Sequence, residues 1–362
     1  MPSGYDYGNA RLRAMRSRLL TAADYYDLLA KATIEEVITA LTETPYKEDI
    51  ELALTRLVGV ACVFEAMRAN LTRTLRQLRD FFEGEPRRLV DLLLQRWDRH
   101  NLLTILRGQS QELTPETVLA TVVPVGQLDE VSLRELARQP GFRAVIELMS
   151  TWRLPYAGAL RRVQPRIGTL PDLDQLELAL NRAHYASLQE QLHQGNGNKA
   201  IVLEQFQTEI DLANLLTGLR LVRRPDLVPL VQQRYNTGNG HPLFIEPGGH
   251  LPVQHLVELI TQAGNLEGFV HGLNNTRYGA ALAAGWQRYQ AGEGRLAVFE
   301  RELERWQAHQ FVAMFNRNPL SIAVPMGYIG CKAIEVANLR LIAQAVALGL
   351  KRDDVRQELI IV

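Results

Sequence analysis

Cysteine is nearly absent from this chain, which has only Cys62 and Cys331 among its 362 residues. No C-x-x-C pair occurs, so neither a disulfide framework nor a cysteine-rich zinc site is predicted. The eight histidines are scattered and form no H-E-x-x-H or other compact ligand pair. We therefore expect no bound catalytic metal, and the low cysteine content suits a reducing compartment.

The chain also lacks an excess of either charge and any long apolar run. Forty basic and forty acidic side chains cancel, which argues against nucleic acid or an anionic membrane as a partner. The longest uncharged stretch runs from Asn318 to Cys331, contains two prolines and two glycines, and is too short to span a bilayer. The N-terminus has no apolar segment typical of a signal peptide. We predict a soluble, cytoplasmic protein.

The common catalytic and cofactor motifs are missing as well. The chain has no G-x-x-x-x-G-K-[ST] phosphate loop, no G-x-S-x-G nucleophile turn and no aspartate-rich D-D-x-x-D run. Gly238 and Gly240 do not make a dinucleotide fingerprint, because a third glycine is missing and Pro242 follows directly. We predict that the chain has no catalytic residue, binds no cofactor and is not an enzyme.

What the chain does have is apolar residues at helical spacing. One stripe follows steps of three and four residues through Val60, Phe64, Met67, Leu71, Leu75, Leu78 and Phe82. No segment of useful length alternates with the period of a strand, so we predict an all-α fold. Pro319 is expected to start the last helical region, and Pro325 is expected to kink it.

A short polar pattern occurs three times: an acidic residue, two free positions, and then Asn-Leu. The three pairs are Asp98 with Asn101, Asp211 with Asn214, and Glu335 with Asn338. The first two copies agree in six of seven letters from the Asn onward, NLLTILR against NLLTGLR. Residues three apart lie on one face of a helix, so each pair is expected to project from a helix in the same direction.

Three further markers recur around this pattern in one order. They are a Leu that opens an amphipathic stretch, a Tyr that closes it, and a Glu that follows an apolar residue. The copies are Leu19, Leu128 and Leu251; Tyr46, Tyr156 and Tyr278; and Glu65, Glu177 and Glu300. The offsets are 27, 28 and 27 residues from Leu to Tyr, and 36, 37 and 38 from Glu to Asn. We predict three similar helical domains, 1–112, 113–236 and 237–362.

The repeated polar pairs allow two interpretations. In a catalytic one, Asp98 and Asn101 would hold a metal ion. In a structural one, each pair ties neighbouring helices together or caps a loop, because buried polar groups need bonding partners. Three copies favour the structural interpretation, since an enzyme rarely needs the same site once per domain. We expect the same of the three Glu markers, and we expect the three Tyr markers to fill domain cores.

Four arginines crowd the first twenty residues: Arg11, Arg13, Arg16 and Arg18. They are a candidate contact for a partner protein. We favour the alternative, in which they form the solvated face of a helix.

Several stretches together resemble one known family. They are Tyr7-Gly8-Asn9-Ala10-Arg11-Leu12-Arg13, the closure Leu41-x-x-Thr44-x-Tyr46, the Pro-Gly-Gly turn at 247–249, the three acidic-x-x-Asn-Leu copies, and the final stretch from Tyr328 to Ile342. The chain resembles the C subunit of bacterial and archaeal V/A-type rotary ATPases, known as the d subunit in eukaryotes, over essentially its whole length.

This resemblance implies three helical domains arranged as a funnel about a pseudo-threefold axis. It implies a non-catalytic rotor part, at one copy per complex, that joins the D and F subunits of the central shaft to the membrane proteolipid ring. There it would transmit torque for ATP-coupled proton or sodium transport, in the cytoplasm and peripheral to the membrane. A helical scaffold or adaptor unrelated to rotary ATPases is the alternative, and an all-α enzyme is a more remote one.

Overall fold

The computed structural model of the chain describes residues 4–163, 172–193, 195, 197–238 and 242–361. Every regular element over these residues is a helix, and the sole strand-like pairing there is an isolated bridge between Gly248 and Pro252. The predicted all-α class is therefore confirmed. The chain divides into two compact units, residues 1–148 with 308–362, and residues 149–307.

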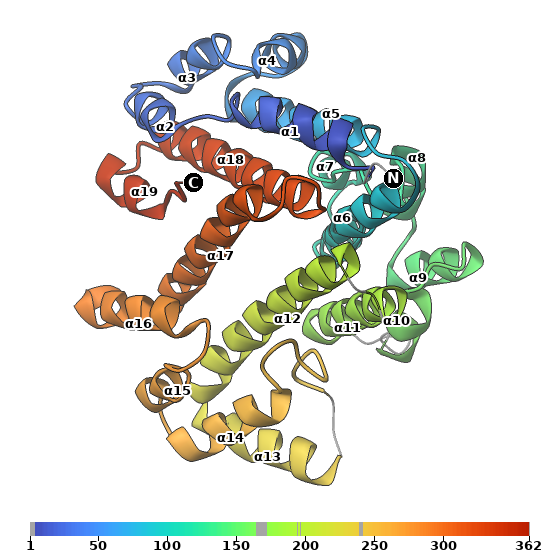
Figure 1. Cartoon of the computed structure of the whole chain (residues 1–362), viewed down its shortest axis with the longest axis vertical. Coiled ribbons are helices and arrows are strands. Elements are labelled where there is room, and N and C mark those ends of the chain that lie inside the picture. Colours follow the sequence, from blue (N-terminus) through green and yellow to red (C-terminus); the bar gives the residue numbers. More distant parts are fainter. Residues whose placement is uncertain (1–3, 164–171, 194, 196, 239–241, 362) are drawn as a thin grey trace. The chain divides into compact units, whose positions relative to one another are not determined.

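The first unit is built from helices at both ends of the chain (Figure 1). They are α1 (Asp6–Arg16), α2 (Ala22–Leu29), α3 (Ile34–Leu41), α4 (Lys47–Leu54), α5 (Gly59–Arg79), α6 (Gly84–Ser110), α7 (Pro115–Leu119), α8 (Glu130–Ala137), α18 (Ala323–Ala347) and α19 (Arg352–Glu358). Two helices, α9 (Phe142–Thr151) and α17 (Ala297–Arg317), begin in one unit and end in the other.

The second unit is also helical. Its elements are α10 (Ala157–Val163), α11 (Leu173–Leu192), α12 (Asn198–Val222), the 3-10 turn η1 (Pro225–Leu227), α13 (Val228–Thr237), α14 (Val253–Ala263), α15 (Leu266–Gly272), α16 (Gly279–Arg288) and the π-helical turn η2 (Tyr289–Glu293). Helix α12 packs against α11, α14 and α15. Its Leu215 and Leu219 meet Phe269 and Tyr278 in one apolar core, where all four side chains are fully buried.

Helix α18 is the centre of the first unit, and most of its residues are buried. It packs against α5 most extensively and also against α1, α2, α3 and α19 (Figure 1). A helix that is apolar on nearly every side needs such cover all round. The last part of the chain therefore shares a core with its first eighty residues.

Pro325 does not kink the last helical region as expected. It lies in the first turn of α18, which begins at Ala323. The first four N–H groups of a helix have no partner within the helix, so the missing N–H of a proline there breaks no bond. The proline thus helps to begin the helix.

Candidate functional site

Each of the three repeated Asn side chains binds both backbone groups of one residue that lies outside the helices. The amide nitrogen donates to the backbone carbonyl of that residue, and the amide oxygen accepts its N–H. The pairs are Asn101 with Val123, Asn214 with Ile245, and Asn338 with Ile360, at 2.8–3.1 Å. All three Asn side chains are buried. Both hydrogen-bonding groups of each amide are thereby used, as burial demands.

The three acidic residues of the pairs lie one helical turn before these Asn residues. They bind backbone N–H groups of other segments than those bound by the Asn residues. The Asp98 carboxylate accepts the backbone N–H groups of Gln127 and Leu128 at 2.7 and 2.9 Å. Leu128 directly precedes Asp129, the N-cap of α8. Asp98 therefore fixes the entry of the chain into α8.

Asp211 does the same at the entry to α14. Its carboxylate accepts the N–H groups of Gly249, His250 and Leu251 at 2.9–3.1 Å. It also accepts the Tyr278 hydroxyl at 2.8 Å. Leu251 directly precedes Pro252, the N-cap of α14, so the pattern seen at α8 recurs within the second unit.

Glu335 holds the entry to α2 within the first unit. It accepts the N–H of Leu20, the residue after the Leu19 marker, at 2.6 Å, and the Tyr46 hydroxyl at 2.6 Å. Leu20 directly precedes Thr21, the N-cap of α2. The last long helix of the chain thus fixes the start of an early one.

A buried lysine completes the Glu335 site. Lys332 donates to Glu335 at 2.7 Å and to the Tyr46 hydroxyl at 2.8 Å, and its ammonium lies 4.3 Å from the centre of the Tyr46 ring. The side chains of Lys332 and Glu335 are only 6% and 2% exposed. An ion pair this deep is held in place by satisfied hydrogen bonds, and loss of either partner would leave an unpaired buried charge.

The tyrosine markers differ in their hydroxyl partners. Tyr46 and Tyr278 donate to Glu335 and Asp211, and burial raises the pKa of both phenols above the ordinary value. The Tyr156 hydroxyl instead lies 3.4 Å from Nδ1 of the buried His184. All three rings are buried, so each contributes to a core.

The three Glu markers lie nearer the surface than the acidic residues of the polar pairs. Glu65 is partly exposed and forms a two-point ion pair with Arg68, at 2.7 and 2.8 Å. Glu177 is partly exposed and Glu300 is exposed. The apolar residues directly before Glu177 and Glu300, Leu176 and Phe299, are fully buried. In these two copies it is therefore the apolar residue, and not the Glu, that packs in the core.

The four arginines near the N-terminus have different surroundings in the fold. Arg13 donates to the Phe315 carbonyl at 3.3 Å, and the Arg16 guanidinium lies 4.2 Å from the centre of the Phe315 ring, so both dock α1 on α17. Arg11 bonds to the Tyr7 hydroxyl at 3.0 Å. Arg18 is exposed and forms no ion pair with any residue that the structure describes.

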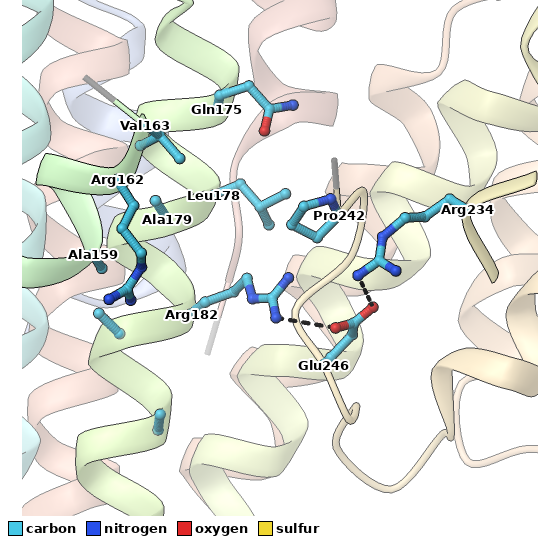
Figure 2. Close-up of a pocket in the computed structure, with 12 residues that line it drawn as sticks. Ala159, Arg162, Val163, Gln175, Leu178, Ala179, Arg182, Arg234, Pro242 and Glu246 are labelled. Atoms are coloured by element: carbon cyan, nitrogen blue, oxygen red, sulfur yellow. Dashed lines mark hydrogen bonds and ion pairs between the residues drawn. The ribbon is translucent and has the colours of Figure 1, made fainter. Parts of the chain in front are cut away.

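A cavity of about 490 Å³ opens in the second unit between α10, α11 and the segment before α14. Figure 2 shows Glu246 bridging Arg182 and Arg234, at 3.0 and 3.6 Å. These groups form a salt-bridge network, and no nucleophile paired with a general base is found among the described residues that line the cavity.

The part of the chain that the structure describes offers neither a metal site nor a membrane span. No group of three His, Cys, Asp or Glu side chains gathers there in a way that could hold a metal ion. None of the described helices combines the length and apolar character needed to cross a bilayer. The polar feature that recurs in both units is a pair of side chains, one Asn and one carboxylate, on the same helix. Each pair binds backbone groups of segments that lie elsewhere in the sequence.

Comparison with known proteins decides the family. The family model of the ATP synthase (C/AC39) subunit matches residues 8–358. The chain belongs to this family. The predicted resemblance is confirmed, and so is the prediction of a chain that is not an enzyme, because the family is a non-catalytic subunit of its complex.

Relatives of this C/AC39 family member are similar over nearly their whole length, and each is named as the C subunit of an A-type ATP synthase. The protein from Methanosarcina mazei is 26% identical over 369 residues, which cover 99% of this chain and 94% of the relative. That from Methanococcoides burtonii is 28% identical over 364 residues, with coverage of 99% and 95%. That from Archaeoglobus fulgidus is 26% identical over 360 residues, with coverage of 99% and 97%.

The buried carboxylate of Asp98 is expected to make the free energy of unfolding depend on pH. Burial raises its pKa to about 6, against the opposing effect of two backbone N–H groups. Because this pKa lies above the ordinary 3.8, the folded chain binds the proton more tightly than the unfolded chain. The stabilisation is complete below about pH 4 and is lost as the pH rises through about 6. Relative to Asp98→Asn, the wild-type free energy of unfolding should fall by about 2–3 kcal/mol over that rise.

Urea unfolding of both proteins at a series of pH values measures this difference. The variant is the control for all other carboxylates, which titrate in both chains. A difference that stays constant across the window would show that Asp98 titrates at its ordinary pKa.

Proposed function

We propose that this chain is a non-catalytic central-stalk subunit of a V/A-type ATPase or ATP synthase. It acts as a socket that links the central shaft to the membrane proteolipid ring and transmits torque for ATP-coupled proton or sodium transport. The observation that carries this proposal is the match to the ATP synthase (C/AC39) subunit over residues 8–358. Relatives of matching length are named as the C subunit of an A-type ATP synthase.

The buried polar contacts support a mechanical role. Torque is transmitted only through parts that deform little, and hydrogen-bonded groups in a low-dielectric interior hold a segment in one position. Asn101, Asn214 and Asn338 each fix a non-helical segment, and the neighbouring carboxylates each fix the start of a helix. These ties join segments that lie 22 to 315 residues apart in sequence.

The matching of these contacts also supports the three-domain organisation, 1–112, 113–236 and 237–362. In each proposed domain one long helix carries the acidic residue and the Asn, and each carboxylate binds the N–H of the residue directly before the N-cap of another helix. In the first unit, Glu335 of the third domain binds Leu20 of the first. We propose that each domain closes on the start of the next in this manner.

Partners and placement follow from the proposed role. The socket would contact the D and F subunits of the shaft on one side and the proteolipid ring on the other, at one copy per complex. It would lie in the cytoplasm, peripheral to the membrane. A broad interface suits such a coupler, because stable interfaces bury more than about 1,000 Å².

Affinity purification from detergent-solubilised membranes tests these partners. A tagged chain should recover D, F and the proteolipid, with D at one copy per tagged chain. The same tag on an unrelated cytoplasmic helical protein is the control. Recovery of none of the three, while the rotary complex is intact in the extract, would contradict the proposal.

A further inference from the structure

The first unit contains a second cavity, of about 280 Å³, whose charged lining is entirely basic. It opens between the end of α1, the C-terminal half of α5 and the second and third turns of α18. Four of its lining residues are cations, namely Arg11, Arg18, Arg73 and Lys332, and none of its described lining residues is acidic. In a chain whose total charge is zero, this is a strong local concentration of one sign.

The four cations differ in how they are compensated. Lys332 is bonded to Glu335, and Arg73 is bonded to Asp49 at 2.5 Å and to Glu48 at 3.5 Å. These carboxylates do not line the cavity. The uncompensated charge therefore belongs to the two arginines of α1 and the turn after it.

Arg11 is held in place without being neutralised. Its guanidinium bonds to the Tyr7 hydroxyl at 3.0 Å and lies 4.8 Å from the centre of the Phe81 ring. Both contacts orient a cation while leaving its charge intact. Arg18 belongs to no ion pair among the described residues. Burial raises the pKa of the neighbouring Tyr328 phenol, and the charge of Arg18 opposes that rise.

The floor of the cavity is polar and buried. Tyr328, Lys332 and Asn70 are each at most 5% exposed, so the cavity reaches past the surface to groups that can hydrogen-bond. Thr74 and Gln77 add further polar side chains from α5. The volume of about 280 Å³ lies just below the usual range of ligand pockets, about 300–1,000 Å³. A small polar ligand fits this space better than a nucleoside.

We propose that this basic pocket binds a small, multiply charged oxyanion of the phosphate class, with Arg11 and Arg18 as its main cationic contacts. Guanidinium groups match phosphate oxygens in planar, two-point contacts, and charge-assisted hydrogen bonds of this kind are stronger than neutral ones. The shared chemistry is that of a phosphate group, carried either by free phosphate or pyrophosphate or by the headgroup of a phospholipid. The proposal does not depend on the rotary function.

Titration of the purified full-length chain tests the site. The probes are inorganic phosphate and pyrophosphate at constant ionic strength, with chloride as the reference salt, followed by calorimetry and by the shift in melting temperature. Vesicles of phosphatidylcholine with and without phosphatidic acid form a separate arm. Saturable, one-to-one binding is expected for pyrophosphate or for the phosphatidic acid vesicles, and the arm that responds identifies the source.

Charge-neutral variants then locate the site. Arg18→Gln and Arg11→Gln should each raise the dissociation constant about tenfold, the loss expected for one charge-assisted hydrogen bond. Arg56→Gln is the matched control, because Arg56 is exposed and does not line the cavity, and it should leave affinity unchanged. Absence of saturable binding to every probe, or equal loss in Arg56→Gln and Arg18→Gln, would overturn the proposal.

Discussion

Replacing Lys332 by methionine is expected to destabilise the chain by about 3–5 kcal/mol. The substitution keeps most of the side-chain volume but removes the cation between Glu335 and the Tyr46 hydroxyl. Glu335 would then be a buried carboxylate without a counter-charge, although it would keep the N–H of Leu20. The effect is large because the cost comes from leaving that charge unpaired.

Urea unfolding combined with hydrogen exchange measures this loss and assigns it to α18 and α2. Lys351→Met is the matched control, because Lys351 is exposed, and it should change stability by less than about 0.5 kcal/mol. The double variant Lys332→Met with Glu335→Gln removes both charges and should recover at least half of the loss. A double variant no more stable than Lys332→Met alone would show that the ion pair is not the cause.

Replacing Gly249 by alanine is expected to destabilise the second unit by ~4 kcal/mol, from overpacking together with desolvated hydrogen-bonding groups. An added Cβ would lie 2.0 Å from the Gln207 carbonyl oxygen and 2.6 Å from Oδ1 of Asp211. Both neighbours belong to α12, and the first is backbone that cannot rotate away. The turn would have to move and lose its hydrogen bonds to Asp211.

Gly158→Ala is the control for this second prediction. Gly158 lies in α10 with nothing within 4 Å of an added Cβ. Alanine there should be neutral or should stabilise the helix by about 0.5–1 kcal/mol. Thermal unfolding of the two variants compares them directly. Equal melting temperatures would contradict the prediction. They would show that the turn tolerates a side chain at position 249 and can still donate its N–H groups to Asp211.

The helical class and the long helices could be predicted from sequence because apolar spacing is a local signal. The stripe lies within α5 from Val60 to Leu78, and Leu75 is fully buried, but its last member, Phe82, lies beyond the end of the helix at Arg79. The repeated Asn residues were found for the same reason, as letters that recur in one order. Their backbone partners could not be found, since Val123 and Ile245 lie 22 and 31 residues away and are bound through groups that every residue has.

The roles of single charged residues were harder to predict. Lys332 was missed, although a lysine three residues before Glu335 at the end of an uncharged stretch is a usable signal. The four arginines of the first twenty residues looked equivalent in sequence. Packing separates them, because Arg13 and Arg16 meet Phe315, about three hundred residues away along the chain, whereas Arg11 and Arg18 line a cavity.

Reconstitution of membranes stripped of this protein tests the proposed socket most directly. The measurement is ATP-driven ion pumping as the purified wild-type chain is added back in known amounts. We predict no coupled pumping in stripped membranes, and a recovery that saturates at one chain per complex. Stripped membranes that pump as well as untreated ones, or recovery that needs several chains per complex, would contradict the account.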